Sequence, residues 1–285
     1  MDEKEKNEFN EIVECMKSLS EIGKVFEKWI DAHCVEKGSL STIPESEKEI
    51  IAYNSFYKDG IIDEAGYRAA KVKVLFISNE ASIGTSNIVN DSKDDKRKIG
   101  NSCGNTAYSF KEYAERDISD NWTTKMRIKY GEMFRIILGE EINKEDWINR
   151  NKNYNKRFAM MNINKRGGFG KVQMEKYLNY IDTFKDFILK EIQLINPDII
   201  VWCGVNTYDK AAKKLFADFE YKRVENLFAT IKLNNRDVKI IKMYHTSPCS
   251  SARVKGFLNK EVYNEDNISK YLFHFNEIWE SLKNK

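Results

Sequence analysis

The chain has 285 residues, which is enough for one large α/β domain, or for one domain with an added helical element. Hydrophobic residues make up 41% and aromatic residues 12% of the sequence, so it can form a sizeable core and is not a disordered chain. The net charge is only +3, no apolar run approaches the roughly 20 residues that span a bilayer, and residues 1–6 lack the apolar segment of a signal peptide. We therefore expect a soluble, cytoplasmic protein that does not contact membranes.

Apolar side chains recur at helical spacing over residues 8–35 and predict a long amphipathic helix with one broad apolar face. A shorter helix is predicted over residues 46–57, where Ser46 and Glu49 have capping-box spacing. The apolar face of the long helix must pack on the main domain, on a protein partner or on a second copy of the chain. We expect residues 1–58 to form a helical N-terminal extension.

Four short runs, rich in β-branched and aromatic residues, predict buried parallel strands. They cover residues 71–78, 158–163, 198–203 and 238–244. The strands are separated by four helical patterns, at residues 107–116, 125–138, 174–195 and 208–216. A final helix starts at Asp266-Asn267, and residues 84–105 have the composition of a loop. The alternation predicts an α/β fold over residues 59–285: a three-layer α/β/α sandwich with a central four-stranded parallel sheet.

Nothing in the sequence predicts a metal site or a cofactor. The five cysteines are scattered with no Cys-x-x-Cys pair, and the chain has three histidines. Basic residues are unevenly distributed: residues 150–174 hold seven Lys and Arg and no acid, and residues 222–260 hold nine against two acids. Such stretches fit a surface that binds a polyanion, although a solvated lysine-rich surface has the same composition.

Each predicted strand ends in a polar segment, and the carboxyl ends of parallel strands meet at one edge of a sheet. The first segment carries Glu80, a carboxylate that can orient or deprotonate a water. The second carries Asn162, whose amide can pair with one edge of a nucleobase. Gly204 follows the third strand, and the fourth delivers His245 to a hydroxyl-rich loop with Arg253, a loop suited to phosphate.

These segments, in this order, resemble the uracil-DNA glycosylase superfamily over most of residues 60–255. The run Tyr244-His245-Thr246-Ser247-Pro248-Cys249-Ser250 resembles the family motif His-Pro-Ser-Pro-Leu-Ser. Glu80-Ala81-Ser82 and Asn162-Ile163-Asn164-Lys165 resemble the Glu-Ala-Pro and Asn-Val-Val-Lys motifs of one branch, and Pro197-Asp198-Ile199-Ile200-Val201 resembles the third family strand. The combination also resembles an atypical bacterial subgroup. The chain departs from the family at Asn79, Ser82, Thr246 and Cys249, and it lacks the four cluster cysteines of the Glu-Ala-Pro branch.

The resemblance implies a monofunctional DNA glycosylase that hydrolyses the N-glycosidic bond of a flipped, damaged or modified base, with DNA as partner and no cofactor. Glu80 would hold the attacking water and His245 would donate to the departing base. Five residues would bind the base: Asn79, Ala81, Tyr108, Phe110 and Asn162. Either Tyr108 or Phe110 would stack on it. DNA contacts fall to Lys165, Arg166, Ser247, Ser250, Arg253 and Lys255.

Each of these residues also has an ordinary structural interpretation. Glu80 could cap a helix, Asn162 could belong to a turn and His245 could be a structural histidine. Two other functional hypotheses stay open. The first is a nucleic-acid-binding protein that keeps the fold without catalysis, and the second is a glycosylase that acts on unusual phage bases in defence.

Overall fold

The computed structural model describes residues 21–26, 28, 29, 32, 59–82, 122–140, 154, 156–168, 172–223, 228–246 and 267–283. Within these ranges, the side chains of residues 80–82, 122–127, 166–168, 205, 221, 223 and 267 lie outside the description. The chain divides into two compact units. Unit 1 comprises Met1–Asp59, Glu80–Ser109 and Asn162–Ile195, and unit 2 comprises the rest.

Unit 2 is built on a mixed sheet of seven strands in the order β1-β3-β2-β4-β7-β6-β5. These strands are β1 (Gly60–Ile61), β2 (Val74–Ser82), β3 (Ala159–Gly168), β4 (Ile199–Cys203), β5 (Tyr221–Arg223), β6 (Phe228–Leu233) and β7 (Arg236–Met243). Strands β2, β4 and β7 pair in parallel, whereas β1 pairs antiparallel with β3, and β6 pairs antiparallel with both β5 and β7. The carboxyl ends of β2 and β3 continue into unit 1.

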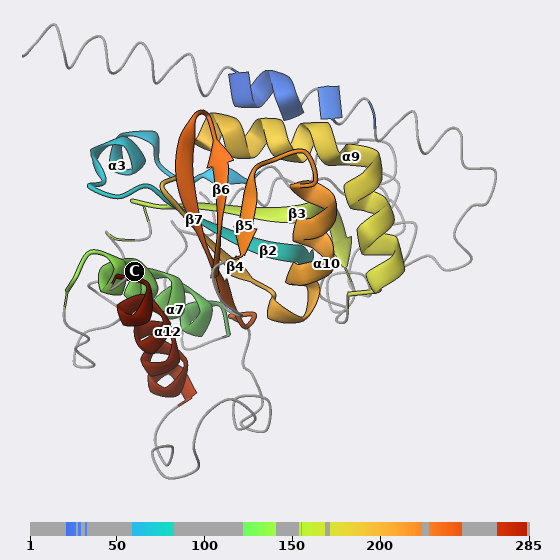
Figure 1. Ribbon diagram of the computed structural model, residues 1–285. Helices are drawn as coiled ribbons and strands as arrows, with labels where there is room; N and C mark the ends of the chain where they lie inside the picture. Colours follow the sequence, from blue (N-terminus) through green and yellow to red (C-terminus); the bar gives the residue numbers. More distant parts are fainter. Residues whose placement is uncertain are drawn as a thin grey trace, which may run out of the picture. The chain divides into compact units, whose positions relative to one another are not determined.

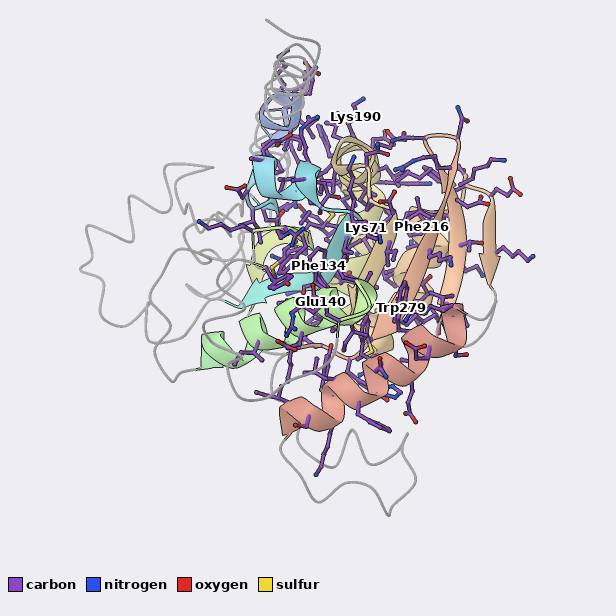
Figure 2. All side chains as sticks on the ribbon, turned by 90° about the vertical axis from the view of Figure 1, so that its left-hand side faces the viewer. Lys71, Phe134, Glu140, Lys190, Phe216 and Trp279 are labelled. Atoms are coloured by element: carbon purple, nitrogen blue, oxygen red, sulfur yellow. The ribbon has the colours of Figure 1, made fainter. Side chains whose placement is uncertain are left out.

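Two helices cover one face of this sheet. Helices α7 (Trp122–Ile137) and α12 (Asn267–Lys283) lie side by side (Figure 1). Their buried Phe134 and Trp279, labelled in Figure 2, belong to the same core cluster as Phe76 of β2, Val201 of β4 and other sheet residues. Alternate residues of each strand point to this layer because successive side chains of a strand face opposite sides of the sheet.

The opposite face packs against α10 (Val205–Leu215). Trp202 of β4 meets the ring of Tyr208 edge-on, with the ring centroids 5.3 Å apart. The buried Lys242 of β7 lies over the same ring, and its Nζ donates to Asp209 Oδ1 at 2.6 Å. Unit 2 therefore carries helices on both faces of its sheet, and it also contains the short helix α3 (Glu64–Ala69).

Unit 1 contains α9 (Met174–Ile195), a part of the N-terminal helix, and the carboxyl ends of β2 and β3. Residues 21–26, 28 and 29 are helical, and Trp29 is fully buried against Tyr180, Phe184 and Phe187 of α9. The described part of the predicted N-terminal helix thus packs within its own chain. The predicted domain boundary at residue 58 stays a prediction.

The α/β class, the four predicted strands and the predicted helices over residues 125–138, 174–195 and 208–216 and near the C-terminus are confirmed. The four-stranded parallel sheet is wrong, because β1, β5 and β6 add antiparallel edges. Strand β6 was missed even though Asn234 and Asn235, both with positive φ, form a two-residue hairpin loop that favours Asn. The predicted helices at residues 46–57 and 107–116 and the loop at residues 84–105 lie outside the described residues.

Candidate active site at the carboxyl ends of the parallel strands

Three parallel strands of unit 2 bring their polar carboxyl-terminal residues to the same level of the sheet. Ile77 of β2 is in register with Trp202 of β4, and Trp202 is in register with Lys242 of β7. The polar residues that follow therefore form one cluster, which we call the strand-end cluster: Ser78, Asn79, Gly204, Thr207, Thr246 and His245, with Lys129 and Tyr130 from α7. This edge of an open α/β sheet is where such folds bind ligands.

Asn79 is fixed by the start of α10. Its side chain is buried, and its Oδ1 accepts a hydrogen bond of 2.6 Å from Thr207 Oγ1. A Cβ atom at Gly204 would lie 2.7 Å from Asn79 Oδ1 and 3.0 Å from Thr207 Oγ1, so no side chain fits at Gly204 without displacing this contact. The Asn79 amide therefore occupies the space beside Gly204 that a side chain would need.

Residues from α7 join β2 to the segment after β7. Thr246 is fully buried, and its Oγ1 donates to the hydroxyl of Tyr130 at 2.9 Å, while Ser78 Oγ lies 3.1 Å from the same hydroxyl. The buried Lys129 donates from Nζ to the carbonyl oxygen of Thr246 at 3.0 Å. Thr246 thus makes a buried hydroxyl contact that a proline at this position could not make.

His245 is half-buried at the end of β7, between Tyr244 and Thr246. Burial and then the nearby charge of Lys129 lower the pKa of its imidazole. Both effects disfavour the charged form, so the ring is neutral at pH 7. A neutral imidazole carries one N–H donor and one acceptor nitrogen. The strand-end cluster therefore offers a neutral histidine beside a buried ammonium group, an arrangement that can stabilise negative charge on a bound molecule.

Asn162 and Lys165 belong to a buried cluster in unit 1. Asn162 donates from its backbone N and its Nδ2 to Asp59 Oδ2, at 2.7 and 3.1 Å. The side chain of Lys165 is completely buried and contacts the carboxylates of Asp59 and Glu191. The prediction that Lys165 contacts DNA is wrong for this side chain, because its ammonium group is enclosed by two acids and has no access to a phosphate.

The structure does not describe the side chains of the remaining predicted site residues. Glu80 and Ala81 lie in β2 and Arg166 lies in β3, but their side chains are outside the description. Tyr108, Phe110, Ser247, Ser250, Arg253 and Lys255 lie outside the described residues. Their assigned roles stay predictions.

Sequence reasoning missed Lys129, Tyr130 and Asp59. Lys129 and Tyr130 occupy adjacent positions in a helix with no motif, and their partner Thr246 is more than 110 residues away along the chain. Asp59 did carry a signal, since it starts the run Asp59-Gly60-Ile61-Ile62 directly before a positive-φ glycine.

The chain matches no protein-family model and no curated protein. The family resemblance therefore rests on the motifs alone. None of the helices in the described part of the chain combines the length and apolarity that a membrane crossing requires.

Proposed function

We propose that this protein is a monofunctional DNA glycosylase that hydrolyses the N-glycosidic bond of a base flipped out of DNA. The observation that carries the proposal is the strand-end cluster, in which a neutral His245 lies beside the buried Lys129 at the carboxyl ends of parallel strands. The motif order along the chain, with Glu80 near the carboxyl end of β2 and His245 after β7, supports the same reaction class.

The chemistry needs a donor that acts on the leaving base. When the bond from the sugar carbon to the base nitrogen breaks, its electron pair leaves with the base, and the sugar becomes cationic in character. An N–H of neutral His245, directed at a base oxygen, stabilises the negative charge that develops there, and the positive field of Lys129 adds to this effect. Water then adds to the sugar carbon and gives its proton to Glu80.

The test uses duplex and single-stranded oligonucleotides that carry uracil, hypoxanthine, xanthine, oxidised or hypermodified bases. Alkali cleaves the strand wherever a base has been released. We expect strand scission with at least one base, and we expect His245→Ala to slow excision by about 10²–10³-fold. Glu80→Gln should reduce turnover by roughly 10²–10⁴-fold.

His274→Gln is the matched control, because His274 is another histidine of unit 2 whose pKa is lowered by burial, and it has no assigned role. It should keep the activity of the wild type. If the wild type binds DNA but releases none of these bases, the protein is a nucleic-acid-binding protein without glycosylase chemistry. If a base is released and both His245→Ala and Glu80→Gln excise it at the wild-type rate, the proposed mechanism is wrong.

A further inference from the structure

Unit 1 contains a buried group of three ionisable residues that the proposed chemistry does not use. The side chains of Asp59, Lys165 and Glu191 are all fully buried. Lys165 Nζ bonds Asp59 Oδ1 and lies 2.7 Å from Glu191 Oε2. The rings of Phe26 and Trp29, from the N-terminal helix, lie 5.6 and 5.2 Å from the same nitrogen. We call these three residues the buried triad.

The two acids of the buried triad are not equivalent. Asp59 accepts hydrogen bonds from Lys165 Nζ, from Asn162 N and from Asn162 Nδ2. Neither carboxylate oxygen of Glu191 has a hydrogen bond of acceptable geometry to another described residue, despite its short distance to Lys165. One ammonium group balances one carboxylate, and hydrogen-bond donors favour the ionised form of the acid that accepts them. Asp59 therefore carries the negative charge.

Glu191 is then the protonated member. Burial raises the pKa of both acids, and that of Glu191 reaches about 8. At neutral pH the buried triad holds a cationic Lys165, an anionic Asp59 and a neutral Glu191, so its net charge is zero. This charge state leaves no unbalanced charge within the buried triad, where such a charge would be costly.

The charge on Asp59 fixes the orientation of the Asn162 amide. An ionised carboxylate only accepts hydrogen bonds, so the group that faces it must be the NH₂ end of the amide. A rotation of the amide by half a turn would bring Asn162 Oδ1 against Asp59 Oδ2 and set two acceptors face to face. The carbonyl end of Asn162 is consequently the end that stays directed away from Asp59.

We propose that Asp59 is a positioning residue that locks the Asn162 amide with its carbonyl oxygen available to a bound base. This inference rests on the proposed function and on the predicted role of Asn162 in binding the flipped base. A locked carbonyl oxygen selects a base whose edge carries a ring N–H donor over a base with a bare ring nitrogen. An amide free to rotate could serve either base and would lose this selectivity.

Two variants that make the same chemical change separate this role from general stability. In Asp59→Asn, Glu191 can release its proton and pair with Lys165, so the buried charge stays balanced. An asparagine at position 59 can either donate or accept, however, so it no longer determines which end of the Asn162 amide faces it. In Glu191→Gln, the replacement matches the neutral carboxyl group in shape and leaves the Asp59–Asn162 bonds intact. Both changes remove one carboxyl of the same buried triad.

The first measurement is excision kinetics on oligonucleotides that carry uracil, hypoxanthine, xanthine, cytosine or adenine. Asp59→Asn should lower kcat/KM on the preferred base by about 10²-fold, because small misplacements of a substrate-contacting group cost this much. Its preference for bases with a ring N–H should fall in parallel. Glu191→Gln should keep both the rate and the preference of the wild type.

The second measurement does not depend on activity. In nitrogen-15 NMR spectra, the Asn162 side-chain amide is assigned by its disappearance in Asn162→Asp. The wild type and Glu191→Gln should each show one amide proton that exchanges slowly with water, since Asp59 holds it. Asp59→Asn should lose that protection, and the wild-type spectrum alone is informative if this variant does not fold.

The outcomes keep the two claims apart. If the wild type releases no base, the proposed function fails, and the NMR comparison still decides whether Asp59 holds the amide. If Asp59→Asn keeps the wild-type preference and the protected amide proton, Asp59 is not a positioning residue. A loss in Glu191→Gln equal to that in Asp59→Asn would also overturn the inference, because it would make the whole triad a structural element.

Discussion

Lys129 is the residue we expect to control the charge of His245. Its buried ammonium group bonds the carbonyl of Thr246, the residue next to His245, and its charge adds to burial in lowering the pKa of the imidazole. In Lys129→Met the burial contribution remains and the charge is gone. The pKa of His245 should therefore rise toward its ordinary value of 6.5, and the acid limb of kcat/KM should move to higher pH.

The imidazole can be followed directly by proton NMR, because the chain has only three histidines to assign. Lys239→Met is the matched control, since Lys239 is an exposed lysine on β7, the strand that leads to His245. It should leave the titration of His245 in place. A titration that is unchanged in Lys129→Met, or that moves to lower pH, would show that the two side chains are not coupled in this way.

Glu191 predicts a particular dependence of stability on pH. Its pKa is raised from 4.5 to about 8, so between these values the folded state binds a proton that the unfolded state has released. The free energy of unfolding then decreases as pH rises through this window. Glu191→Gln removes the titrating group. As pH rises from 5 to 8, the free energy of unfolding of the variant should therefore increase relative to that of the wild type.

Urea unfolding of both proteins at a series of pH values measures this difference. The comparison between the two proteins cancels the contributions of other titrating groups to first order. If the difference in free energy of unfolding between the two proteins stays constant across the range, Glu191 is ionised throughout. The charge state given for the buried triad would then be wrong.

At the scale of elements, the junction between β2 and α10 depends on Gly204. A Cβ there would approach Asn79 Oδ1 to 2.7 Å, closer than side chains tolerate, so Gly204→Ala must push Asn79 or the start of α10 out of place. We expect a loss of about 1–3 kcal/mol in the free energy of unfolding, as for other overpacked sites. Excision should also slow, because the strand-end cluster is displaced.

Gly23→Ala is the control for this change. Gly23 is helical, and a Cβ on it would meet nothing within 4 Å, so the substitution should leave stability unchanged or raise it by up to about 1 kcal/mol. Urea midpoints of the two variants give the comparison. A Gly204→Ala protein as stable as the wild type would indicate that the junction relaxes without strain.

The elements that could be predicted from the sequence are those whose signal is local. β4 is a continuous apolar run and α9 has an uninterrupted helical period, so both were located closely. Strand β5 has three residues and β1 has two, too few for any periodicity.

The site residues divide in the same way, into those with a local sequence signal and those without one. His245 could be found from its motif, whereas Lys129 and Asp59 act on residues more than 100 positions away, a relation that only the folded chain reveals.

At the scale of the whole molecule, the chain passes between the two units within strands. Unit 1 is assembled from three separate segments, and the change of unit occurs inside β2 and inside β3. The N-terminal helix is part of this assembly, because Trp29 is completely buried on α9 and lies over the ammonium group of Lys165. We therefore assign residues 21–26, 28 and 29 a structural role in unit 1.

Replacement of Trp29 by alanine tests this role. The change leaves a cavity beside Tyr180, Phe184 and Phe187 and should cost about 3–5 kcal/mol, the range for large aromatic residues in cores. Phe273→Ala is the control: Phe273 is 43% exposed on α12, and its loss should change stability by no more than about 0.5 kcal/mol.

Native-state hydrogen exchange on the Trp29→Ala variant then shows where the stability is lost. We expect the amides of α9 to lose more protection than those of β4, because the contacts of Trp29 with α9 lie in unit 1. An equal loss in both elements would mean that the two units unfold together, and an unchanged protein would mean that the N-terminal helix does not hold unit 1.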